Sequence, residues 1–226
     1  MEKQEHARFH LKTLDDLRGE IEQRGLDIPV SEQLDLLAEP LRVGRLTLPN
    51  RFSVQPMEGF DSRADGAPGE LTFRRYKRYA SGGFGLIWFE ATAVMKEARS
   101  NPGQLYIHGD NAREFGALVR EVRRTARDAF GREPALILQL THSGRYSKPT
   151  GRPAPLIAHH SPILDPRHEL PPDYPLVTDE YLDGLRETYA QAARLAHEAG
   201  FDGVDVKSCH RYLVSELLAS FTREGR

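Results

Sequence analysis

The sequence predicts an α/β protein with a parallel sheet and, within that class, half of a (β/α)8 barrel. Short apolar runs alternate with longer segments of helical period, which is typical of α/β proteins. The extra chain length follows the predicted strands, where barrels and open sheets build their sites. The glycine-rich segment 81–85 precedes a strand instead of following one, so the sequence favours the barrel over a dinucleotide-binding open sheet.

The N-terminal region predicts a helix followed by a hairpin. Apolar residues recur at Leu11, Leu14, Leu17 and Ile21, a near-helical spacing that predicts an amphipathic helix over 11–24. Residues 41–48 alternate around a glycine, which is typical of a small hairpin. We interpret residues 1–40 as a helical extension and residues 41–226 as the main domain.

Four strands and four helices are expected in the main domain. The apolar runs predict strands over 52–56, 84–89, 135–140 and 203–207. The helical periodicity predicts helices over 70–79, 111–130, 178–199 and from 211 onward, the first with Leu71 and Tyr76 on its core face. Thr178 and Gly200 are suitable start and stop residues for the third helix.

Composition excludes several function classes. The 31 basic and 33 acidic residues give a net charge of −2, so charge provides no case for nucleic acid or an anionic membrane. No apolar run approaches the roughly 18 residues of a membrane span. A single cysteine, Cys209, rules out an internal disulfide and fits a reducing cytoplasm. The pair His159-His160 lacks a matching carboxylate or cysteine pattern, and we expect no metal site.

Four segments carry a family resemblance, each at the end of a predicted strand. They are residues 48–57 (ending in Pro-Met), 89–93, 138–145 (Leu-Gln-Leu-Thr-His-Ser-Gly-Arg) and 201–213 (ending in His-Arg-Tyr-Leu). Together, in this order, the sequence resembles the old yellow enzyme family, the FMN-dependent NADH:flavin oxidoreductases. The resemblance spans roughly residues 40–226.

The resemblance implies a TIM (β/α)8 barrel with FMN at its C-terminal face and NADH or NADPH as the reductant. The family reaction passes a hydride from the flavin to an activated C=C bond of a small-molecule substrate. Pro56, Met57, Ala91 and Gln139 match positions near the flavin. Glu58 also falls at this site but departs from the family's small residue, and its carboxylate could instead turn toward Arg74 or Arg75.

The catalytic assignments rest on the last segment. The resemblance implies that Lys207 and His210 bind the substrate as oxyanion donors, with lysine in place of the family's usual histidine. Tyr212 matches the tyrosine that protonates the substrate carbon. Spacing alone favours a solvated lysine at a strand end and a hydrogen-bonded loop histidine, and without the resemblance Tyr212 is an ordinary aromatic residue that packs at a helix start.

The chain covers only part of a barrel, and two alternative functions stay open. Only four of eight barrel strands are visible, so we expect a truncated N-terminal half that needs a missing C-terminal half or a homo-oligomer. Such a fragment would be inactive or would act as a non-enzymatic partner-binding chain. A TIM-barrel lyase with Lys207 as a Schiff-base amine is a further enzymatic alternative.

Overall fold

The computed structural model describes residue 8 and residues 10–225, and the chain divides into two compact units between Leu36 and Leu37. The first unit contains the predicted helix as α1 (Leu14–Gln23). Thr13 caps it, because its hydroxyl accepts from the Asp16 N–H at 3.1 Å while the Asp16 carboxylate accepts from the Thr13 N–H at 2.9 Å. The apolar side of α1 is only half-buried. A short 3-10 turn, η1 (Asp35–Leu37), spans the division.

The second unit begins with the predicted hairpin, β1 (Leu41–Val43) paired antiparallel with β2 (Leu46–Leu48). Gly44 adopts φ +57° at its turn, a conformation that glycine reaches without strain.

A four-stranded parallel sheet follows, in the order β3 (Ser53–Val54), β4 (Leu86–Ala93), β5 (Ala135–Thr141), β6 (Gly203–Val206). The predicted α/β class with a parallel sheet is confirmed. The strand that was predicted over 52–56 has only two residues, and Pro56 beyond it cannot donate to a ladder. β4 runs four residues further than expected and contains a register shift between Phe89 and Thr92.

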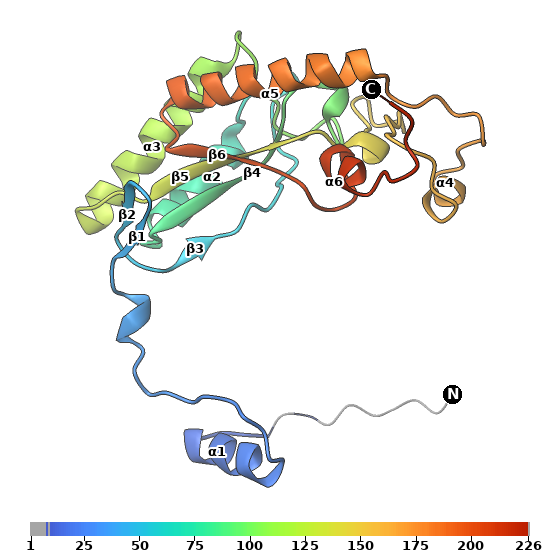
Figure 1. Ribbon diagram of the computed structural model, residues 1–226. Coiled ribbons are helices and arrows are strands. Elements are labelled where there is room, and N and C mark those ends of the chain that lie inside the picture. The colour runs from blue at the N-terminus through green and yellow to red at the C-terminus, as the bar shows by residue number, and fades with distance from the viewer. Residues whose placement is uncertain (1–7, 9, 226) are drawn as a thin grey trace. The chain divides into compact units, whose positions relative to one another are not determined.

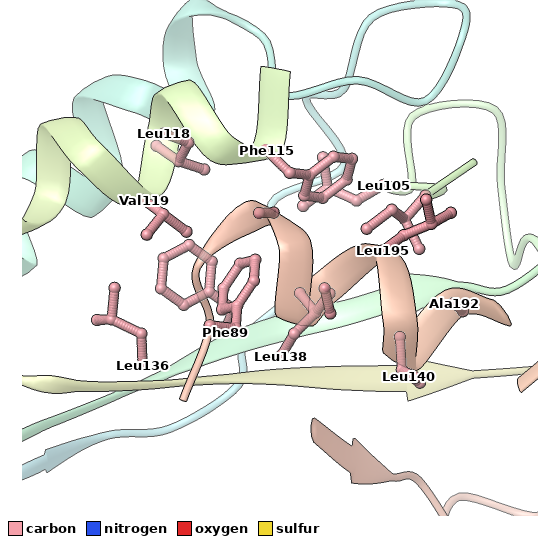
Figure 2. Packing of buried hydrophobic residues seen from close by; sticks show 14 of the residues in the cluster. Phe89, Leu105, Phe115, Leu118, Val119, Leu136, Leu138, Leu140, Ala192 and Leu195 are labelled. Atoms are coloured by element: carbon pink, nitrogen blue, oxygen red, sulfur yellow. The ribbon is translucent and has the colours of Figure 1, made fainter. Parts of the chain in front are cut away.

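Helices α2 (Glu70–Ala80), α3 (Ala112–Phe130) and α5 (Asp179–Ala199) pack on the sheet, and the core forms between them and the strands (Figure 1). Figure 2 shows Leu136, Leu138 and Leu140 of β5 beneath side chains of α3 and α5. The predicted core face of α2 is confirmed at Tyr76, which is buried with Thr72 and Ala80, but it is wrong at Leu71, which is 55% exposed. Leu71 lies five positions before Tyr76, which places it about 140° around the helix and away from the sheet.

The outer strand β6 leaves apolar surface uncovered. Val204 and Val206 pair with Leu138 and Leu140, so they face the same side of the sheet as that core. They are nevertheless 38% and 46% exposed.

The segments that follow the strands are partly helical. They contain η2 (Lys96–Ala98), η3 (Gly144–Tyr146), α4 (Leu164–Arg167) and α6 (Leu213–Leu218). Helix α5 begins at the predicted cap, Thr178, and ends at Gly200 with φ +96°. Within the described residues, no helix is both long and apolar enough to cross a membrane.

Candidate active site

Three strand ends meet in one group of side chains, which we call the mouth cluster: Glu58, Ser100, Lys207 and Tyr212. The Lys207 Nζ lies 3.3 Å from Glu58 Oε1, and Glu58 Oε2 accepts from the Ser100 hydroxyl at 3.2 Å. Both members of the ion pair are shielded from water, with side-chain exposures of 4% for Lys207 and 12% for Glu58. The cluster thus joins segments that follow β3, β4 and β6 at the carboxyl edge of the sheet.

Lys207 is held by the sheet itself. Its backbone N–H donates to Leu140 O at 2.9 Å, which extends the pairing of β5 with β6 by one residue. Because side chains alternate along a strand, Lys207 faces the same side as Asp205. A buried lysine at a strand end requires a partner, and Glu58 supplies it.

Tyr212 stands at the N-terminus of α6 and packs against the lysine. The Lys207 Nζ lies 4.6 Å from the centroid of the Tyr212 ring, within the range of a cation–π contact. Burial raises the pKa of Tyr212 to about 12, and the negative charge of Glu58 adds to this shift. The phenol therefore stays protonated at neutral pH and can donate a proton.

His210 is exposed, and its ring centroid lies 6.1 Å from that of Tyr212. His210 and Arg211 adopt φ values of +59° and +58°, a strained conformation for residues with a side chain. The turn brings His210 beside the tyrosine, while Lys207 contacts Glu58 and Tyr212.

Gln139 lies on the face of the sheet opposite the helices, beside Asp205, which precedes Lys207 by two residues. It is 7% exposed, and its amide Nε2 donates to Asp205 Oδ2 at 2.7 Å. The two residues are register partners on β5 and β6, which explains the contact.

The remaining sequence-predicted site residues lie at the ends of β3 and β4. Met57 is 70% exposed and Pro56 is half-buried. Ala91 is fully buried at the register shift in β4, and its carbonyl accepts from Gln104 Nε2 at 3.0 Å. Met57 therefore presents apolar surface at a strand end, whereas Ala91 contributes backbone.

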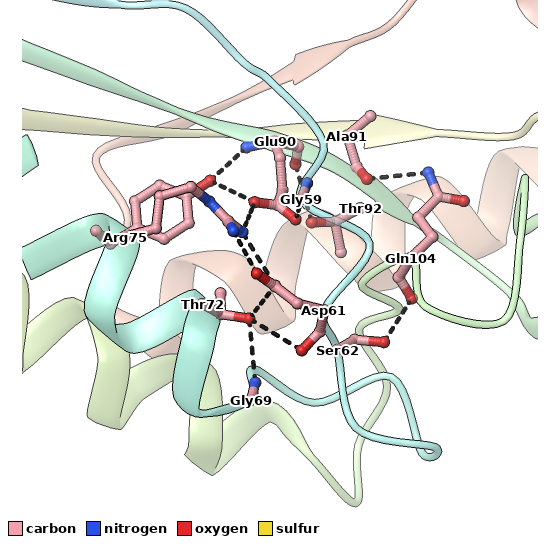
Figure 3. Close-up of polar contacts among 11 residues, drawn as sticks. Gly59, Asp61, Ser62, Gly69, Thr72, Arg75, Glu90, Ala91, Thr92 and Gln104 are labelled. Atoms are coloured by element: carbon pink, nitrogen blue, oxygen red, sulfur yellow. Dashed lines mark hydrogen bonds and ion pairs between the residues drawn. The ribbon is translucent and has the colours of Figure 1, made fainter.

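A buried polar network fixes the segment that carries Glu58 (Figure 3). The Glu90 carboxylate accepts from the Gly59 N–H at 3.3 Å and from Arg75 Nη2 at 2.6 Å, and Arg75 also pairs with Asp61. Burial raises the pKa of Glu90, although the nearby Arg75 opposes this. Because Arg75 is engaged here, Glu58 turns toward Lys207, which decides between the orientations that the sequence left open.

His142 and Arg145 follow β5 and hold the loop over residues 141–177 in place through hydrogen bonds and ion pairs. The His142 Nδ1 accepts from the Gly144 N–H at 3.0 Å and its Nε2 lies 2.8 Å from the Tyr181 hydroxyl. Burial lowers the pKa of His142 to about 4, so the imidazole is neutral. The Arg145 side chain is fully buried between Asp165 and Glu216.

Sequence reasoning missed two residues of this region. Asp205 could have been found from the strand period, since it lies two positions before Lys207 and shares its face. Ser100 lies in an irregular segment without a motif, so its approach to Glu58 carried no sequence signal.

Known proteins match the second unit. The model of the NADH:flavin oxidoreductase / NADH oxidase family matches residues 36–224. An NADPH dehydrogenase of Halalkalibacterium halodurans is 32% identical over 180 residues, which cover 79% of this chain and 49% of that protein.

Solved structures agree with this match. A morphinone reductase mutant in complex with tetrahydroNAD superimposes with a TM-score of 0.66 at 27% identity, covering 84% of this chain and 54% of that one. The old yellow enzyme from Trypanosoma cruzi gives a TM-score of 0.64 at 26% identity, covering 80% and 52%. The chain thus spans about half the length of these relatives.

Proposed function

Because the chain belongs to the NADH:flavin oxidoreductase / NADH oxidase family, we propose that it acts in an FMN-dependent NAD(P)H oxidoreductase that reduces activated C=C bonds of small molecules. The mouth cluster is the observation that carries this proposal. It gathers a cationic donor and a protonated phenol at the carboxyl edge of a parallel sheet, where α/β enzymes place their chemistry.

Residues 41–226 would form the N-terminal half of a TIM barrel, and residues 1–40 a helical extension. Four parallel strands and coverage of about half of each relative support this division. The exposed Val204 and Val206 suit a further barrel unit packed beside β6, from a C-terminal half or a second copy. We place the protein in the cytoplasm, where the exposed Cys209 would stay reduced.

The residues at the strand ends fit a flavin ring. Met57 offers exposed apolar surface, Ala91 is small, and the Gln139 amide can donate and accept on the same side of the sheet. Glu58 lies beside them, neutralised by Lys207. In TIM barrels a phosphate is commonly held after strands seven and eight, so in this assignment the four strands contact the ring and a further barrel half holds the phosphate.

FMN, when bound, supplies the hydride that reaches the alkene. The chain's own residues would then act on the substrate. Lys207 and His210 donate to its carbonyl oxygen and stabilise the negative charge that develops there. Tyr212 delivers its proton to the α-carbon, and a pKa of about 12 keeps that proton in place until it is needed.

The test separates the two half-reactions. With FMN at saturation, the Tyr212→Phe variant should be reduced by NAD(P)H at the wild-type rate, followed by anaerobic bleaching of the flavin absorbance. Its reoxidation by 2-cyclohexenone should slow by about 10²–10⁴-fold, the usual contribution of a positioned general acid. Equal loss in both half-reactions would contradict the assignment.

The two alternatives predict other outcomes, one in the same experiment and one in a separate trapping experiment. A non-enzymatic chain would leave the flavin oxidised in the presence of NAD(P)H. A lyase with Lys207 as a Schiff-base amine would be trapped by borohydride with a carbonyl substrate, and the engagement of this amine by Glu58 speaks against that chemistry.

A further inference from the structure

The contacts of the segment that carries Glu58 hold its carboxylate in the mouth cluster. The Gly59 N–H is anchored on Glu90. A Cβ on Gly59 would collide with the guanidinium of Arg75, which is itself held by Asp61 and Glu90. On the other side, the Ser100 hydroxyl donates to Glu58 Oε2. Glu58 is therefore a fixed counter-ion of Lys207.

Lys207 has one partner in Glu58 and one in the Tyr212 ring, and it is buried against both. An ammonium group has three donors, so it retains hydrogen-bonding capacity for a substrate oxygen. Its charge, however, is already balanced by a neighbouring carboxylate. A second carboxylate, Asp205, faces the same side of the sheet and is bonded to Gln139.

We propose that Glu58 determines the charge class of the substrate, restricting the site to uncharged carbonyl acceptors and rejecting carboxylates. This inference rests on the proposed function, which places the substrate oxygen on Lys207. An incoming carboxylate would have to share that ammonium with Glu58 and would meet its negative charge at close range. A carbonyl oxygen is neutral when the substrate binds, so it accepts the same hydrogen bond from Lys207 without this repulsion.

The test compares two probes of equal shape and different charge, trans-cinnamamide and trans-cinnamate at pH 7.5. Dissociation constants are measured by calorimetry on the 226-residue chain, with and without saturating FMN. The wild-type chain should bind the amide more tightly. Glu58→Gln keeps the shape and removes the charge, and it should shift the affinity ratio toward cinnamate by about tenfold or more, since an unbalanced ammonium attracts anions.

Two further variants isolate the charge effect. Glu97→Gln removes the same charge from an exposed carboxylate on the segment between β4 and α3, and should leave the ratio within about twofold of wild type. The double variant Glu58→Gln/Lys207→Gln replaces the ion pair with a neutral pair. It should return the ratio to the wild-type preference for the amide, even if Glu58→Gln alone loosens the fold.

The proposal is overturned if the affinity ratio of amide to carboxylate is the same in Glu58→Gln as in the wild type. It is also overturned if neither probe binds to the wild-type chain or to Glu58→Gln. An equal shift in Glu97→Gln would also overturn it. Failure of FMN to bind would instead contradict the proposed function. The two failures can be told apart, because the affinity ratio of the two probes is also measured on the flavin-free chain.

Discussion

Arg145 is a buried guanidinium whose partners come from the 141–177 loop and from α6. Its Nε donates to Glu216 Oε1 of α6 at 2.7 Å, its Nη1 pairs with Asp165, and its Nη2 donates to His159 O at 2.9 Å. The side chain has no exposed surface. The network fastens the 141–177 loop to the helix that begins beside Tyr212.

Arg145→Met tests the strength of this network. Methionine retains much of the apolar volume but leaves Asp165 and Glu216 buried without their cation. Breaking a buried ion pair by removing one partner costs about 3–5 kcal/mol, a large share of the roughly 5–15 kcal/mol that stabilises a typical domain. At about 2–4 °C per kcal/mol for a chain of this size, the melting temperature should fall by roughly 6–20 °C.

The assays are thermal and urea unfolding, both followed by far-UV circular dichroism, with Arg124→Met as the matched control. Arg124 also pairs with two carboxylates, Glu121 and Asp128, but its side chain is 56% exposed. Exposed pairs contribute little, so the control should unfold close to wild type. Equal urea midpoints for Arg145→Met and Arg124→Met would show that the buried network of Arg145 does not stabilise the fold.

Four further predictions follow from single residues. Because burial lowers the pKa of His142 from 6.5 to about 4, the unfolded chain binds a proton that the folded chain does not. The unfolding free energy is therefore unaffected by this group above pH 6.5 and falls by about 3 kcal/mol as the pH drops from 6.5 to 4. In His142→Gln this loss of unfolding free energy should be smaller, as measured by urea unfolding over the same pH range. Gly144→Ala should lower the unfolding free energy by about 1–3 kcal/mol, since φ is +57° and the new Cβ would lie 2.7 Å from the Leu213 nitrogen. Gly184→Ala, inside α5 with nothing within 4 Å, should raise it by about 0.5–1 kcal/mol, and thermal melts that move both variants in the same direction would contradict this. Finally, the pKa of about 12 for Tyr212 predicts that proton delivery persists to pH 10 and declines only as the pH approaches 12; a stopped-flow decline centred near pH 8 would be inconsistent with its role.

Local signals in the sequence were sufficient for the presence of the sheet strands and of helices α2, α3 and α5, but not for the short helix α4 in the 141–177 loop or for the length of β3. Thr178 caps α5 because its hydroxyl accepts from the Tyr181 N–H, and Gly200 ends it in the left-handed conformation, as their residue types predict. The continuous apolar runs identified β4 and β5 because both faces of these strands are largely covered. The position of Lys207 at a strand end followed from the same pattern.

Long-range pairing could not be predicted in the same way. Glu58 and Lys207 are 149 positions apart, and their contact depends on how two irregular segments leave the sheet. The sequence offered Arg74 and Arg75 as equally suitable partners for Glu58, and only the folded network shows that Arg75 is engaged by Asp61 and Glu90. The register shift in β4 likewise depends on tertiary contacts rather than on a local motif.

The central claim is that the strand ends of this chain bind a flavin ring, and the direct measurement is quenching of riboflavin fluorescence by the purified protein. We predict saturable quenching by the wild-type chain, because the ring contacts need no phosphate group. Gln139→Leu should weaken this binding by about tenfold, the value of one or two lost hydrogen bonds. Quenching that never saturates, or that is the same in the variant, would contradict the claim.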